Sequence, residues 1–108
     1  MKSEKIYDIA IIGAGPCGLT AAIYSCRQGF SVVVFDKGMP GGQAALTENI
    51  ENYPGFSEGV NGFELMSRAF AQAASFGAEY VNSEVTRLYL RGQKKRVECA
   101  IAILAAQA

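Results

Sequence analysis

Three glycines and one carboxylate are the residues of this chain whose types and spacing favour a chemical role. Gly13, Gly15 and Gly18 form a G-x-G-x-x-G pattern after one apolar run, and Asp36 follows a second. The first glycine permits a tight turn, the second lets a diphosphate approach the backbone, and the third lets a helix lie close to a sheet. The carboxylate can accept hydrogen bonds from both ribose hydroxyls and would repel the extra phosphate of NADP. The pattern predicts a binding site for an adenine dinucleotide.

Other catalytic side chains are scarce. The chain has no His, which excludes Ser-His and Cys-His catalysis and most zinc sites. The three cysteines, Cys17, Cys26 and Cys99, show no C-x-x-C spacing, and their odd number argues against a disulfide framework. We therefore expect a reducing, cytoplasmic environment. Cys17 lies inside the glycine pattern, where a redox role competes with the simpler interpretation of a small space-filling residue.

Composition limits the partners. The 108 residues suffice for one small domain, and half of them are apolar, as in a globular protein. The formal net charge of zero argues against nucleic acid as a partner. The apolar run near the end, residues 99–106, is far shorter than the roughly 20 residues of a membrane span.

A strand before the glycine pattern and a helix after it must position these groups. Residues 6–12 form an apolar run, interrupted only by Asp8, that is typical of a buried parallel strand. Pro16 suits the first turn of a helix, residues 19–28 show helical spacing, and Gly29 is a plausible end. Residues 31–35 predict a second strand, which completes a strand–helix–strand unit.

The rest of the chain predicts one long loop, one helix and more strands. Residues 37–59 are irregular and rich in Gly, Pro, Asn and Glu, and loops of this length are usually functional or disordered. Asn61 suits a helix N-cap, and Glu64 completes a capping-box pattern. This helix is expected to run to about residue 76, with an apolar stripe formed by Phe63, Met66, Phe70 and Ala73. Gly77 ends it, a short strand follows at 78–81, and residues 85–90 and 96–104 are expected to pair as a hairpin around Gly92.

The glycine pattern alone does not separate FAD from NAD, but longer segments narrow the choice. "YDIAIIGAGPCGLTAAIYSCRQG", "PGGQ", "IENYPGF" and "GFELMSRAFAQAASFGAEYV" together resemble the amino-terminal FAD segment of low-molecular-weight thioredoxin reductases, over about residues 6–97. Two features depart from the family pattern. Asp36 stands where the family more often has Glu, and the tail reads "ILAAQA" where the family has a motif like "ILATGA".

The resemblance implies FAD as the cofactor and gives each site residue a role. Those expected to wrap the FAD pyrophosphate are Gly13, Ala14, Gly15, Pro16 and Gly18. Asp36 would hold the adenosine ribose. Gly41, Gly42 and Gln43 would lie along the ribityl chain and flavin, and Asn52 would hydrogen-bond near the isoalloxazine ring. From the residues alone, Gly41 and Gly42 also fit an ordinary flexible turn, and Asn52 fits a turn before Tyr53.

The expected fold class is α/β: a Rossmann-like FAD-binding βαβ unit with a parallel sheet, incomplete relative to the three-layer family fold. Residues 1–108 would form a partial FAD-binding domain, without the NADPH domain and the C-x-x-C. In the complete family enzyme, electrons pass from NADPH through FAD to a protein disulfide, with a thioredoxin-like partner and a homodimeric assembly. Two alternatives stay open: a non-enzymatic dinucleotide-binding module that uses NAD or ADP, and a non-functional truncated fragment.

Overall fold

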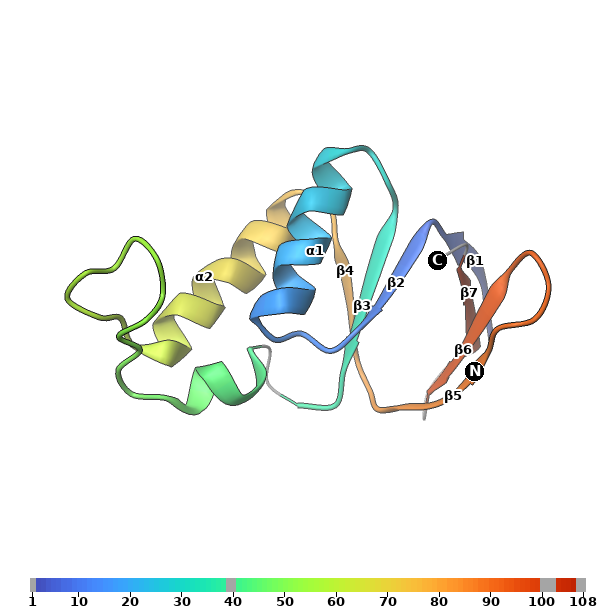
Figure 1. The fold of residues 1–108 in the computed structure, drawn as a ribbon. Helices are drawn as coiled ribbons and strands as arrows, with labels where there is room; N and C mark the ends of the chain where they lie inside the picture. Colours follow the sequence, from blue (N-terminus) through green and yellow to red (C-terminus); the bar gives the residue numbers. More distant parts are fainter. Residues whose placement is uncertain (1, 39–40, 100–102, 107–108) are drawn as a thin grey trace.

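The computed structural model describes residues 2–38, 41–99 and 103–106, with side chains for 5–38, 41–42 and 44–98. The elements follow in the order β1 (Lys2–Tyr7), β2 (Ile9–Ile12), α1 (Pro16–Arg27), β3 (Val32–Asp36), the 3-10 helix η1 (Gly42–Leu46), α2 (Gly62–Ser75), β4 (Glu79–Asn82), β5 (Val85–Tyr89), β6 (Lys95–Cys99) and β7 (Ile103–Ala106). They form two sheets, of order β2-β3-β4 and β1-β7-β6-β5. Figure 1 shows both helices on one side of the three-stranded sheet and the four-stranded sheet on the other.

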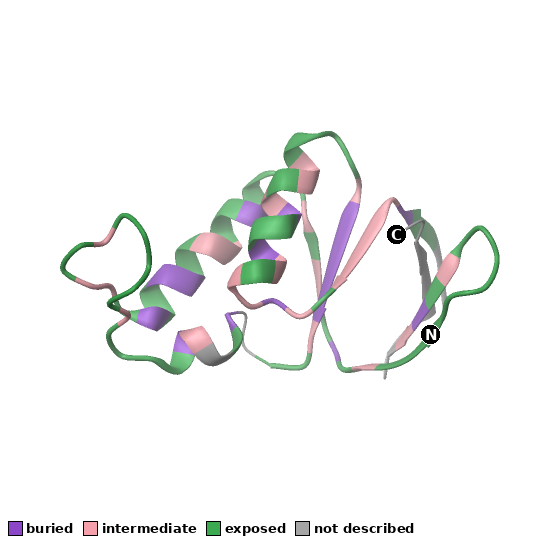
Figure 2. Ribbon diagram, in the orientation of Figure 1, coloured by how far each residue is buried: buried purple, intermediate pink, exposed green. Residues whose placement is uncertain are grey.

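The strand–helix–strand unit is confirmed as β2, α1 and β3. β2 pairs in parallel with β3 from Ile9↔Val32 to Ile12↔Phe35, and β4 pairs in parallel on the other edge of β3. β3 is buried on both faces (Figure 2) because its side chains alternate between two layers. Val32 and Val34 face the helices, whereas Val33 and Phe35 face the second sheet. This alternation makes β3 the centre of a three-layer fold.

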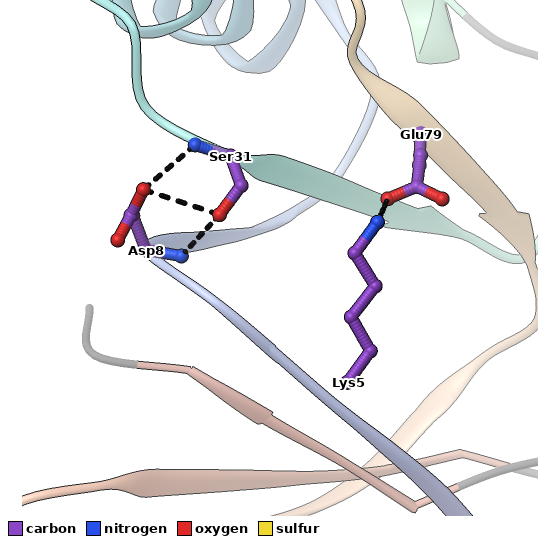
Figure 3. Close-up of polar contacts among 4 residues, drawn as sticks. All are labelled: Lys5, Asp8, Ser31 and Glu79. Carbon is purple, nitrogen blue, oxygen red and sulfur yellow. Dashed lines mark hydrogen bonds and ion pairs between the residues drawn. The ribbon is translucent and has the colours of Figure 1, made fainter.

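The expected single strand over residues 6–12 is wrong, because the chain changes sheets at Asp8. Asp8 Oδ2 accepts hydrogen bonds from the Ser31 N–H at 2.8 Å and the Ser31 hydroxyl at 3.1 Å. The Asp8 N–H donates to Ser31 Oγ at 2.9 Å (Figure 3). These bonds satisfy the polar groups where the strand breaks, so β1 joins the four-stranded sheet and β2 the three-stranded one.

A second contact links the two sheets at β1 and β4. Lys5 Nζ lies 2.6 Å from Glu79 Oε2 (Figure 3), and both side chains are about half exposed. The hydrogen bond with Lys5 lowers the pKa of Glu79, and the same bond raises the pKa of Lys5. Tyr7 lies beside this pair, and burial is the main cause of its raised pKa.

The expected strand over residues 96–104 is also wrong. β5 and β6 form the expected antiparallel hairpin around Gly92, but the chain then forms a separate strand, β7, which pairs antiparallel with β6. β7 also pairs in parallel with β1, with Ile6 opposite Ala105. The first described strand, β1, is therefore an edge strand of the second sheet beside the last one, β7, a pairing that no local sequence pattern reveals.

Both helices end as expected, but one residue of the apolar stripe expected for α2 is exposed. Gly29 and Gly77 adopt positive φ angles of 92° and 102° directly after the caps of α1 and α2. In α2, Met66 and Ala73 are buried and Phe70 is half-buried, but Phe63 is 52% exposed, so its place in the stripe is wrong. Leu65 is buried instead, and with Met66 it packs against Ala45 of η1.

The long segment 37–59 is partly ordered by α2. η1 lies within it, and Ile50 forms an isolated bridge with Val60. Ala44, Ile50, Phe56 and Val60 pack against the cluster of Ala45, Leu65 and Met66. Within the described ranges, neither helix has the length and hydrophobicity needed to cross a bilayer.

Candidate dinucleotide-binding site

The glycine pattern forms the turn from β2 into α1. Gly13 has φ +107°, and its N–H donates to the Phe35 carbonyl oxygen at 2.7 Å, which extends the parallel ladder by one bond. A Cβ at Gly18 would collide with the carbonyl oxygen of Gly13. Two of the three glycines therefore have the predicted steric reasons: a tight turn at Gly13 and close helix–sheet contact at Gly18.

The first turn of α1 has no side-chain cap. Gly15 is the N-cap, supplies no side-chain cap, and is followed by Pro16 and by no acidic residue in the first turn. Within the described part of the chain, the N–H groups of Gly15, Cys17 and Gly18 make no hydrogen bond. A Cβ at Gly15 would meet nothing within 4 Å. The helix start thus combines unpaired donors, the positive end of the helix dipole and open space, which suit a diphosphate.

Asp36 lies at the carboxyl end of β3, beside this turn. Its Oδ2 accepts a hydrogen bond from the Ala14 N–H at 2.8 Å, and its Oδ1 accepts one from the Gly38 N–H at 3.2 Å. The Gly38 carbonyl oxygen accepts from the Tyr80 hydroxyl at 2.8 Å. Burial raises the pKa of Tyr80, and the charge of Asp36 adds to the effect. The carboxylate has about four lone-pair directions, so two bonds leave it able to accept more.

Gly41 and Gly42 lie against the same turn. The Gly41 N–H donates to the Ala14 carbonyl oxygen, and a Cβ built on Gly42 would lie 3.8 Å from Gly15 Cα. Gly41 has φ +109°, and a Cβ there would collide with the side chain of Met66. The structure therefore brings these two glycines to the predicted site and gives Gly41 a steric reason to be glycine.

The other expected residues are placed differently. Gln43 belongs to η1, but its side chain lies outside the described residues, as does Gln107 in the tail. Asn52 is exposed and lies between η1 and α2, in the segment that Figure 1 shows as a loop extending beyond the amino-terminal end of α2. With Tyr53, Phe56 and their neighbours it lines a separate hollow of about 470 Å³. The structure does not bring Asn52 to the glycine turn.

Sequence reasoning missed part of the site's surroundings. A hollow of about 230 Å³ at the carboxyl ends of β2, β3 and β4 is lined by Gly13, Asp36 and their neighbours, and by Ser83, Glu84 and Val85. Ligands of open parallel sheets bind at the carboxyl ends of the strands. The expected short strand at 78–81, which pairs in parallel with β3 as β4, was the signal that could have pointed to residues 83–85.

The described cysteines and acidic residues form no metal site. Cys17 and Cys26 are free thiols, and burial raises the pKa of Cys26. Over residues 2–38, 41–99 and 103–106, no three His, Cys, Asp or Glu side chains gather in a way that could hold a metal ion.

Comparisons with known proteins give the relatives of this chain. The family model for pyridine nucleotide-disulphide oxidoreductases matches residues 7–106. A thioredoxin reductase of Bacillus subtilis is 52% identical over 85 residues, which are 79% of this chain and 27% of that protein. One of Aquifex aeolicus is 44% identical over 94 residues, 87% of this chain and 29% of that protein. The solved thioredoxin reductase of Streptococcus pyogenes superposes with a TM-score of 0.90 at 37% identity, over 97% of this chain and 34% of that one. The chain thus spans about a third or less of these relatives.

Proposed function

The chain belongs to the pyridine nucleotide-disulphide oxidoreductase family, and from this premise we propose that it binds FAD as the cofactor-binding portion of a thioredoxin-disulfide reductase-like oxidoreductase. FAD, when bound, supplies an acceptor for a hydride and a donor of an electron pair to a disulfide. The described residues of this chain contribute binding and orientation. NADPH as the electron source and a thioredoxin-like protein as the acceptor belong to the proposal for the complete enzyme.

The open start of α1 is the observation that carries this proposal. Among the described residues, the N–H groups of Gly15, Cys17 and Gly18 have no hydrogen-bond partner, and a Cβ built on Gly15 would meet nothing within 4 Å. A pyrophosphate placed there would accept these hydrogen bonds and lie at the positive end of the helix dipole. Ala14 and Pro16 would complete the wrapping of the two phosphates.

Asp36 and the neighbouring hollow would hold the adenosine end. The carboxylate retains acceptor capacity for the ribose hydroxyls, and the hollow of about 230 Å³ opens beside it. Gly41, Gly42 and Gln43 would line the path of the ribityl chain, and Asn52 would contact the flavin ring. The homodimer and the cytoplasmic location stay predictions from the sequence.

The test begins with the purified full chain. We expect a yellow protein that releases FAD on heating, and an apo form that quenches added FAD fluorescence on titration. Free FAD at 100 times its dissociation constant should stabilise the fold by roughly 2.7 kcal/mol. Gly15→Val should abolish the uptake of FAD, because the valine side chain would occupy the phosphate position.

A matched control separates binding from folding. Tyr24→Val alters an exposed residue, 70% accessible, on the same helix and should leave FAD uptake unchanged. A colourless, folded chain that NAD or ADP stabilises would replace the proposal by a non-enzymatic binding module. A folded chain that takes up no nucleotide, or one in which Gly15→Val binds FAD as wild type does, would refute it.

A further inference from the structure

Both backbone hydrogen-bonding groups of Ala14 have partners within the dinucleotide-binding turn. Its N–H donates to Asp36 Oδ2 at 2.8 Å, and its carbonyl oxygen accepts from the Gly41 N–H. Ala14 itself is completely buried. This residue lies between Gly13 and Gly15, so its conformation sets the direction in which the chain enters α1.

The Asp36 side chain joins segments that are distant in the sequence. One oxygen holds the turn 22 residues earlier, and the other holds the Gly38 N–H. Gly38 is in turn fixed to β4 by the Tyr80 hydroxyl, whose ring contacts Phe70 of α2 edge-on, with the ring centroids 5.2 Å apart. The glycine turn is thereby tied, through one carboxylate, to β3 and β4.

The length of the Asp side chain suits this contact. The pairing of Ile12 with Phe35 places the residue after β2 beside the end of β3. From there one methylene brings the carboxylate to the Ala14 N–H. The Asp36 carboxylate therefore reaches the turn directly from the end of β3.

We propose that Asp36 is a positioning residue that holds the glycine turn in its binding conformation before any nucleotide arrives. This inference rests on the proposed function and adds a second role to the ribose contact. Glycine-rich segments lose much conformational freedom when they become ordered. A turn fixed in advance leaves less of that cost to the binding step, which raises affinity.

Two ligands separate positioning from ribose recognition. ADP carries the ribose hydroxyls, and an ADP analogue without both hydroxyls does not. Asp36→Ala should weaken binding of the analogue by about tenfold, since a hydrogen bond to a charged group is lost from the turn, and should weaken ADP further, since the ribose contact is lost as well. Asp36→Asn retains one acceptor oxygen for the Ala14 N–H and should restore the analogue's affinity to near the wild-type value. Loss of ADP affinity alone, with the analogue bound as tightly as by wild type, would overturn the proposal.

Amide hydrogen exchange of the ligand-free chain gives a readout independent of binding. The Ala14 amide should be protected in the wild type and in Asp36→Asn, and should exchange about tenfold faster in Asp36→Ala, which removes the acceptor. Equal protection in Asp36→Ala and wild type would refute the positioning role. If the wild type binds neither ADP nor FAD, the proposed function fails, whereas the exchange rates still decide whether Asp36 holds the turn.

Discussion

The two helices of this chain begin in opposite ways. At the start of α2, the Asn61 side chain accepts from the Glu64 N–H at 3.0 Å, and the Gly62 N–H donates to the Thr47 carbonyl oxygen at 2.8 Å. At the start of α1, Gly15 has no side chain, and within the described residues the N–H groups of three residues have no acceptor. Unpaired donors at a helix start cost stability unless water or a ligand accepts from them. The α2 start is thus capped by the chain's own side chain and backbone, whereas the α1 start has donors that the proposed diphosphate would satisfy.

One feature is common to both helix starts. Gly18 in α1 and Gly62 in α2 each lie against a backbone carbonyl, of Gly13 and of Ala44, with no room for a Cβ. Close contact with the preceding loop is therefore a requirement of the fold at the start of each helix. The two helix starts differ in whether the chain itself supplies acceptors for the first N–H groups.

The largest effect is expected from Gly18→Ala. The new Cβ would meet the Gly13 carbonyl oxygen, and we expect a loss of about 3 kcal/mol in the free energy of unfolding. FAD binding should disappear as well, because α1 would move away from the turn. Urea unfolding followed by circular dichroism measures the first effect. Gly62→Ala is the counterpart at α2 and should cost similar stability, while folded material keeps its affinity for ADP.

Gly15→Asp tests the contrast between the helix starts directly. The carboxylate can cap the free N–H groups of α1, so the stability of the apo chain should change by no more than about 0.5 kcal/mol. The same carboxylate should weaken FAD binding by about a hundredfold or more, because two like charges would meet at the phosphate position. Calorimetric titration checks the affinity. Undiminished FAD binding would show that the start of α1 is not the phosphate site.

Asn61→Ala should give a smaller effect confined to α2. Loss of the N-cap bond should lower the free energy of unfolding by about 1 kcal/mol, and Asn61→Ser should recover most of it. Affinity for FAD should stay at the wild-type value in both variants. A parallel loss of affinity would mean that the two helix starts are energetically coupled.

The smallest effect is expected for the ion pair of Lys5 and Glu79, which links the two sheets and lies apart from both helix starts. Contact with Lys5 holds the pKa of Glu79 below its usual value of 4.5. The pair's contribution is therefore present above pH 4.5 and is lost as the pH falls through the lower pKa of the folded state. The unfolding free energy of Glu79→Gln should fall less steeply than that of the wild type below pH 4.5. Asn61→Ala, which adds no titratable group, should show the wild-type slope.

Much of the site could be predicted from the sequence because its signals are local. Gly13, Gly18 and Asn61 act on neighbours within a few residues, and Gly29 ends a helix by its own conformation. The break at Asp8 depends on Ser31, 23 residues away, and could not be read from the apolar run. The division of residues 96–104 into two strands depends on the pairing of β7 with β1, and the burial of Leu65 in place of Phe63 depends on contact with Ala45 of η1. Features decided by distant partners were the ones missed.

The parallel pairing of β1 with β7 has a consequence for synthesis on the ribosome. Ile6 pairs with Ala105, so β1 waits without this partner for roughly 5–20 s at typical translation rates. By the time β7 is synthesised, the residues of the β2-β3-β4 sheet and of both helices have already been translated. Nascent β1 would expose an unpaired edge during that interval, which makes it a template for pairing with another chain.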